Sequence, residues 1–193
     1  MTRRAGLDKA GVIRAAAELA DAEGLEALTI ASLAARLGVR PPSLYNHTGG
    51  LDDLRRSLTL LGLRELLAAL QAAAAGRAGE AAVAALAEAQ RAYAHAHPAR
   101  YALTVRAPAP DDQEYTAAAE AILGLLLQVL EPFSLSRTDT LHAIRGLRAL
   151  VHGFVLLEAA GGFGMPLDRD ESFRRLLEAF LRGLRPQSPP KVA

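Results

Sequence analysis

Cysteine and tryptophan are both absent from this 193-residue chain. Without cysteine the chain has no disulfide, no thiolate zinc site and no thiol nucleophile. Aromatic residues make up only 5% of the sequence, whereas alanine and leucine, both strong helix formers, dominate it. Alternating runs of β-branched residues are also missing. The composition therefore favours an all-α fold.

A large net charge and a long apolar run are missing as well. The formal net charge is +1, so any binding of nucleic acid has to come from a local patch rather than from general attraction. The N-terminus has a basic arm at Thr2, Arg3 and Arg4, which fits either a disordered end or a contact with a DNA backbone. No secretory signal follows it, and no apolar run reaches about 18 residues without a charge. We expect a cytoplasmic protein with no membrane span.

Residues 28–54 carry the pattern of two short helices joined by a tight turn and followed by a third. Thr29 can cap the first helix, because its hydroxyl can accept a backbone N–H that has no partner within the helix. Gly38 suits the positive φ at which many helices end. Between them the apolar positions recur at helical spacing: Ile30, Leu33, Ala34 and Leu37. This spacing is typical of a helix-turn-helix and points to DNA.

The second helix of this pattern begins at Pro41 and Pro42, whose missing N–H groups cost nothing in a first helical turn. Leu44 is its one inward side chain. Around Leu44 we expect this helix to carry four polar residues: Ser43, Tyr45, Asn46 and His47.

The rest of the chain predicts further helices, about nine in all, over roughly residues 9–23, 51–75, 80–96, 98–105, 111–130, 136–160 and 170–184. Either Asp111 or Asp112 can cap the helix that ends near residue 130, and either Ser136 or Thr138 can start the next one. Residues 122–130 are almost all apolar, which predicts a helix buried nearly all round. The expected domains are a DNA-binding domain over residues 1–52 and a ligand-binding and dimerisation domain over residues 53–193.

With these residues laid out, the first 60 or so resemble the TetR-type transcriptional regulators. The resemblance rests on LTIASLAARLGV, on SLYNH and on the acidic start of the fourth helix. Near the other end, LRALVHGFVLLEAAGGFG is similar to one class of TetR-type ligand domain. The resemblance implies a homodimer with an N-terminal DNA reader and a C-terminal ligand and dimerisation domain. It implies a regulator, most often a repressor, that a small-molecule effector releases from a palindromic operator in double-stranded DNA.

The resemblance also assigns roles within residues 28–54. Thr29 would offer its hydroxyl and nearby amides to a phosphate. Arg40, Pro41, Pro42 and Ser43 would face the major groove, with Arg40 as the residue to contact a guanine. Tyr45 and His47 would bind phosphates, and Asn46 either a base or a phosphate.

Two positions depart from the family pattern. Leu51 stands where relatives often have a phosphate-binding lysine, and Ala31 where some have a base-reading arginine. Fewer cationic contacts predict a shallower salt dependence of DNA binding.

Assignments in the C-terminal domain leave alternatives open. A polar stripe of His142, Arg145, Arg148 and His152 fits either a solvated or dimer-rim face, or an effector pocket in which an arginine meets an acidic ligand. Tyr101 fits either the core or that pocket. The proposed effector contacts are Tyr101, Arg145, Arg148 and His152. Pairing of the last two long helices with their copies would place Gly153, Phe173, Leu177 and Phe180 at or near the seam.

Signatures of catalysis are missing. His95 and His97 are two residues apart and point different ways on a helix, so both are expected on the surface and not around one metal. Glu158 is expected to be a helix-end charge. No Ser/His/Asp set, paired carboxylates or glycine-rich phosphate loop is evident, so we expect no enzyme, cofactor or metal. The alternative to a DNA-binding regulator is a helical module that binds a small molecule or a partner and has lost DNA affinity.

Overall fold

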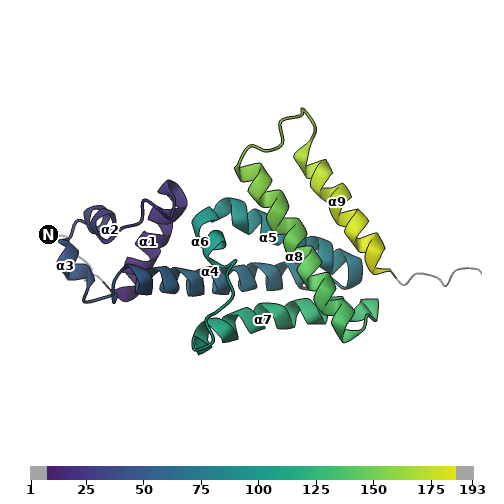
Figure 1. Ribbon diagram of the computed structural model, residues 1–193, viewed down its shortest axis with the longest axis horizontal. Helices are drawn as coiled ribbons and strands as arrows, with labels where there is room; N and C mark the ends of the chain where they lie inside the picture. The colour runs from purple at the N-terminus through teal and green to yellow at the C-terminus, as the bar shows by residue number, and fades with distance from the viewer. Residues whose placement is uncertain (1–7, 186–193) are drawn as a thin grey trace, which may run out of the picture. The chain divides into compact units, whose positions relative to one another are not determined.

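The structure is a computed structural model that describes residues 8–185, and every regular element in that range is helical. Nine α-helices and one 3₁₀ turn follow in chain order (Figure 1): α1 (Lys9–Glu23), α2 (Ile30–Leu37), α3 (Pro41–Leu44), α4 (Leu51–Ala74), α5 (Gly79–Ala96), α6 (Pro98–Leu103), α7 (Gln113–Leu130), η1 (Glu131–Phe133), α8 (Arg137–Ala159) and α9 (Arg169–Leu184). The all-α prediction is confirmed. The basic arm at Arg3 and Arg4 lies outside the described residues.

The chain packs as two compact units. Unit 1 combines the chain up to Leu66 with Ala96–Ala119, and unit 2 combines Leu67–His95 with the chain from Glu120 onward. Helices α4 and α7 each run from one unit into the other. This division describes packing, so the functional boundary at residues 52 and 53 stays a prediction.

Local capping explains where most helices begin. The carboxylate of Asp8 accepts the backbone N–H of Gly11 at 2.6 Å at the start of α1. Of the two aspartates that could cap α7, Asp112 does so, and its carboxylate accepts the N–H of Tyr115 at 3.0 Å. At α8 the cap is Ser136, which accepts the N–H of Asp139 at 3.1 Å. Each cap satisfies an N–H that has no partner inside its own helix.

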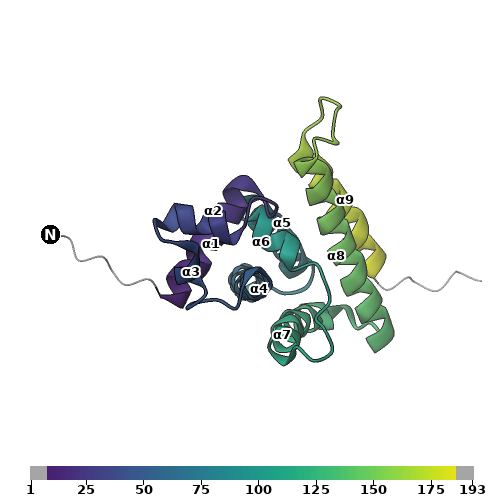
Figure 2. The ribbon, with the colours of Figure 1, turned by 60° about the vertical axis from the view of Figure 1, so that its left-hand side comes forward.

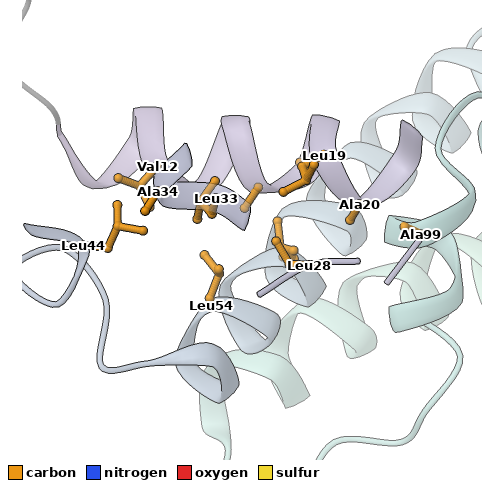
Figure 3. Packing of buried hydrophobic residues seen from close by; sticks show 12 residues of the cluster. Val12, Leu19, Ala20, Leu28, Leu33, Ala34, Leu44, Leu54 and Ala99 are labelled. Carbon is orange, nitrogen blue, oxygen red and sulfur yellow. The ribbon is translucent and has the colours of Figure 1, made fainter. Parts of the chain in front are cut away.

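The core of unit 1 joins α1, α2, α3, α4 and α6. Twelve buried side chains make up this core: Val12, Ala16, Ala17, Leu19, Ala20, Leu28, Leu33, Ala34, Leu44, Leu54, Leu58 and Ala99. Figure 3 shows Val12 and Leu44 towards one end of the core and Ala20 and Ala99 towards the other. Because Ala99 belongs to α6, the core around the helix-turn-helix is completed by a residue far downstream in the sequence.

In unit 2, α8 and α9 lie side by side (Figure 2). The rings of Phe154 on α8 and Phe173 on α9 meet edge to face, with centroids 5.0 Å apart. A Cβ atom at Gly146 would come within 3.2 Å of the ring of Phe180. The glycine therefore allows a close approach of the two helices there, whereas nothing within the described chain comes within 4 Å of a Cβ at Gly153.

The prediction that residues 122–130 are buried nearly all round is wrong. Only Val129 and Leu130 at the end of α7 are buried, and the other apolar side chains of this stretch are half-buried. An apolar sequence shows that a surface favours burial, but it does not supply the neighbours that cover it. By length and composition, Leu51–Ala74 and Gln113–Phe133 could cross a membrane, a test that core helices also pass. The absence of a membrane span therefore stays a prediction.

Candidate nucleic-acid interface

Helix α2 is held at both ends by short-range hydrogen bonds. At its start, Thr29 and Ser32 form a reciprocal capping box, in which Thr29 Oγ1 accepts the N–H of Ser32 and Ser32 Oγ accepts the N–H of Thr29, both at 3.0 Å. At its end, Gly38 has φ 66° and ψ 32°, a left-handed conformation that favours glycine. The N–H of Val39 then bonds to the carbonyl of Ala34 at 3.0 Å. These bonds fix the direction in which the chain enters α3.

The reading helix is shorter than the sequence predicts. Helix α3 ends at Leu44, and Tyr45–His47 form a turn in which the N–H of His47 bonds to the carbonyl of Leu44 at 2.8 Å. The extension of this helix over Tyr45, Asn46 and His47 is therefore wrong. Gly49 and Gly50 follow closely, and because glycine disfavours a helix interior, only one helical turn forms.

Three polar residues at the start of α3 and in the turn after it are exposed: Arg40, Tyr45 and Asn46. Arg40, the N-cap position of α3, is exposed, and its side chain makes no capping bond. Tyr45 is 60% exposed, Asn46 is exposed and His47 is half-buried. Within residues 8–185, no side chain bonds or ion-pairs with Arg40, Tyr45 or Asn46.

The remaining predicted contacts surround these residues. Pro41 and Pro42 are exposed and Ser43 is half-buried, while Leu44 beneath them is fully buried. Thr29 is exposed, but its hydroxyl is engaged in the capping box and lies 3.0 Å from Ser32 Oγ. The structure thus brings an exposed arginine, an amide, a phenol and an imidazole onto one short segment over a buried core. Such a set can donate hydrogen bonds to phosphates and base edges.

The start of α4 is acidic rather than basic. The carboxylate of Asp53 accepts the backbone N–H of Gly49 at 3.2 Å and lies 3.1 Å from the hydroxyl of Thr48. The Gly49 hydrogen bond is the main reason why the pKa of Asp53 lies below its ordinary value. Leu51, which stands where family members often have a phosphate-binding lysine, is half-buried and packs against the unit 1 core. On α2, Arg36 already pairs with Glu18 at 3.3 Å. Arg36 therefore already has an anionic partner on α1.

The four residues proposed to bind the effector are divided between the two units. Tyr101 belongs to unit 1 and is 5% exposed. Arg145 and Arg148 are exposed on α8, and His152 is half-buried. Burial, and then the charge of Arg148, lowers the pKa of His152.

Unit 2 has two surface cavities elsewhere, of about 610 and 500 Å³. Arg91, Asp168 and Asp170 line both of them. The cavities adjoin an ion-pair cluster that the sequence did not predict. The Arg91 guanidinium forms a two-pronged pair with Glu158, through Nε at 2.9 Å and Nη2 at 2.6 Å.

Glu158 lies at the end of α8, as expected, but its side chain is only 4% exposed. It also accepts a contact from His95 at 2.9 Å. Hydrogen bonds from Arg91 and then His95 hold the pKa of Glu158 below its ordinary value, although burial acts in the opposite direction. His95 and His97 belong to different units and to different clusters.

Two of the four residues proposed for the dimer seam are buried inside unit 2. Phe173 and Leu177 are 2% and 4% exposed. Gly153 and Phe180 are half-buried. The exposed apolar side chains of α8 and α9 are others: Leu141, Leu156, Leu157 and Leu176.

Comparisons with known proteins agree with this geometry. The family model described as bacterial regulatory proteins, tetR family, matches residues 12–57, and the model described as tetracyclin repressor-like, C-terminal domain, matches residues 83–180. An uncharacterised HTH-type transcriptional regulator of Mycobacterium tuberculosis is 36% identical, over 95% of this chain and 84% of that protein. Another, from Bacillus subtilis, is 35% identical over 95% of this chain and 96% of its own length.

A solved structure shows the same fold over nearly the whole chain. It is a protein of unknown function from Rhodococcus sp. RHA1, with a TM-score of 0.80 at 25% identity, covering 96% of this chain and 100% of that one.

Proposed function

Because this chain belongs to the TetR family of helix-turn-helix transcriptional regulators, we propose that it is a cytoplasmic, homodimeric repressor that a small molecule releases from a palindromic operator. One observation carries the DNA-reading part of this proposal. The exposed side chains of Arg40, Tyr45 and Asn46, which flank α3, have no partner within residues 8–185, while Leu44 beneath them is fully buried. Groups held rigidly and left unpaired are suited to a ligand that supplies the partners.

Arg40 is proposed as the base-reading residue, because its guanidinium can bind the two acceptors of a guanine in the major groove. Tyr45 and His47 are proposed to bind phosphates and fix the register, with Asn46 on a base or a phosphate. Pro41, Pro42 and Ser43 would line the groove. Since the Thr29 hydroxyl caps α2, the helix end itself, with its positive dipole, supports a phosphate near Thr29.

Dimerisation is proposed through α8 and α9. Leu156 and Leu176 are 53% and 41% exposed, and such apolar surface favours a partner. Gly153 and Phe180 would lie at the seam, and Phe173 and Leu177 would support it from within the protomer. A second copy supplies a second reader for the other half of a palindrome.

The effector is proposed to bind in the C-terminal domain, which the tetracyclin repressor-like match supports. Arg145 and Arg148 place positive charge on α8, which favours an acidic molecule, and His152 would add a hydrogen bond. Tyr101 would contribute an aromatic contact. Release of DNA requires that this molecule bind one conformation of the dimer better than the other.

Selection of an operator from random double-stranded DNA tests the DNA-reading part with the full chain. We expect one palindromic sequence to be enriched, and Arg40→Ala to weaken its binding by about 1–3 kcal/mol while relaxing the preference at one base pair. Arg77→Ala, an exposed arginine after α4 and outside the proposed dimer helices, is the matched control and should bind as the parent does. No enriched sequence would refute the proposal. If Arg40→Ala and Tyr45→Phe left all DNA binding unchanged, a module without DNA affinity would be favoured.

A further inference from the structure

We propose that Arg100 is a positioning residue for DNA reading, because together with Asp21 and Glu65 it clamps α6 onto α1 and α4 within unit 1. This inference rests on the proposed function, since it needs a chain that binds an operator. None of the three residues lies on α2, α3 or the turn after it. Their effect on DNA binding would therefore be exerted through the packing of the reading unit.

The first part of the clamp is a helix cap supplied by another helix. At the start of α6 the N-cap residue His97 makes no side-chain capping bond, and Pro98 has no N–H. The next two amides, of Ala99 and Arg100, both donate to Oδ1 of Asp21, at 3.0 and 3.2 Å. Asp21 lies in the last turn of α1, where a carboxylate faces the negative end of its own helix dipole. The positive end of α6 offsets that unfavourable position.

The second part is the guanidinium of Arg100, which is only 12% exposed. Its Nε donates to Oδ2 of Asp21 at 2.8 Å, and its Nη1 pairs with a carboxylate oxygen of Glu65 on α4. Its Nη2 lies 2.6 Å from Nδ1 of His97. Because an arginine can only donate, Nδ1 of His97 accepts this bond. One side chain thus connects α1, α4 and α6, and two carboxylates face its single positive charge.

Close packing at the same place makes the clamp tight. A Cβ atom at Gly62 of α4 would lie 3.1 Å from the carbonyl oxygen of Arg100 and 3.1 Å from Cγ2 of Thr104. Glycine at this position therefore lets the backbone of α6 rest against α4. Ala99 is part of the unit 1 core and Leu103 packs against it. A shift of α6 would disturb the same core that seats Leu33 of α2 and Leu44 of α3.

The clamp therefore sets how α1, and the α2–α3 pair packed on it, is oriented relative to α4. Two reading units bind a palindrome only when their separation matches that of the half-sites. A looser orientation would broaden the range of separations that the dimer accepts and would weaken binding at the best one. The number of phosphate contacts would not change, so the salt dependence should be preserved.

The experiment compares full-length variants on the selected operator and on copies with one or two base pairs added to or removed from its centre. We expect Arg100→Ala to bind the best operator about tenfold more weakly, within the range for coupling between separate sites, and to lose part of its preference among spacings. The slope of affinity against salt should stay as in the parent chain. Arg100→Lys, which keeps the charge but cannot reach Asp21, Glu65 and His97 at the same time, should recover part of the preference.

Arg64→Ala is the matched control. Arg64 precedes Glu65 on α4 and pairs with Glu114, but both side chains are more than half exposed, at 63% and 52%. Its loss should change neither affinity nor spacing preference. If Arg100→Ala does not fold, Asp21→Asn decides the question, since the amide oxygen can still accept the α6 N–H groups while the charge facing Arg100 is gone.

Three results would overturn the proposal. One is an equal loss of affinity at every spacing. Another is a reduced fraction of active protein with unchanged affinity and preference. The third is a slope of affinity against salt that is shallower by the amount expected for about one phosphate contact, which would mean that Arg100 binds a phosphate itself. If the parent chain selects no operator, the proposed function fails as well. If the parent chain binds an operator and the Arg100 and Asp21 variants bind it in the same way, only the clamp is refuted.

Discussion

Unit 1 and unit 2 leave different kinds of side chain on their surfaces. Of the eight exposed large hydrophobic side chains in residues 8–185, seven belong to unit 2, and the one in unit 1 is Tyr45, which carries a polar tip. Unit 1 instead exposes unpaired polar groups such as Arg40 and Asn46. Unit 1 thus completes its own apolar core and offers hydrogen bonds, while unit 2 offers apolar surface. The first suits DNA and the second suits another protein surface.

Each unit also holds one arginine largely out of solvent, but the two are used differently. In unit 1, Arg100 joins three helices next to a helix N-terminus. In unit 2, Arg91 lies over the rings of Phe154 and Phe173, at 5.3 and 4.8 Å from the ring centroids, and pairs with Glu158. Arg100 holds three helices together, whereas Arg91 packs on two aromatic rings while Glu158 neutralises its charge.

The largest effect on stability should come from breaking the core of unit 1. Leu54→Ala removes a side chain that is 0% exposed, so we expect the free energy of unfolding to fall by about 2–5 kcal/mol. Met165→Ala in unit 2 removes a side chain that is 75% exposed and should change it by less than about 0.5 kcal/mol. Urea unfolding at one fixed protein concentration measures both. Equal losses of stability in Leu54→Ala and Met165→Ala would refute the contrast between the buried core of unit 1 and the exposed apolar surface of unit 2.

A smaller loss is expected from the ion pair in unit 2. Glu158→Gln removes the partner of Arg91, but Arg91 keeps Asp170 at 2.8 Å. The loss should therefore be about 2 kcal/mol, below the range of about 3–5 kcal/mol for breaking a fully buried pair. Glu120→Gln, an exposed position on α7, is the control.

The same pair predicts a pH dependence. The pKa of Glu158 is lowered in the folded protein, mainly by Arg91, so its contribution is complete above the unfolded value of about 4.3 and is lost as pH falls from there towards the folded value. Urea midpoints measured from pH 7 downward should fall less steeply below about pH 4.3 in Glu158→Gln than in the parent chain. Parallel curves would show that Glu158 does not contribute to the acid sensitivity.

The features that the sequence predicts correctly are those with a local cause. The capping residues Thr29 and Ser136 and the left-handed Gly38 each act within a few residues of their own position, so residue type and spacing are sufficient to find them. The polar residues of the candidate site lie on a local segment of the same kind, and their contacts with DNA stay a prediction. Helix-turn-helix segments are local in sequence.

The features that the sequence misses depend on distant partners. Asp21 caps a helix 78 residues away, and no local pattern marks a cap of that kind. Glu158 lies near the end of α8 like a surface charge, but Arg91 from α5 covers it. Phe173 and Leu177 are apolar on the inner side of α9. A helical period shows which residues share a face, but not whether that face meets the same chain or a second copy.

Adjacent positions on α9 can sharpen the assignment of the apolar surface. Leu176 is 41% exposed and Leu177 is 4% exposed. If the exposed face is the dimer seam, Leu176→Glu should give folded protein whose dimer dissociates at about tenfold or more higher concentration, equivalent to about 1.4 kcal/mol. Helical content should be unchanged, and the mass by light scattering should shift towards the monomer on dilution. A dimer of parental stability in Leu176→Glu would place the seam elsewhere.

The smallest effect should separate stability from DNA reading by means of two equivalent caps. Thr29 caps α2 in unit 1 and Ser136 caps α8 in unit 2, each by accepting one backbone N–H. Thr29→Ala and Ser136→Ala should each lower the free energy of unfolding by about 1 kcal/mol. Only Thr29→Ala should also weaken operator binding, because α2 sets the entry of α3, and Thr29→Ser should restore it by keeping the hydroxyl. A failure of Thr29→Ser to restore binding would mean that the threonine methyl group, rather than the cap, supports the DNA-binding surface.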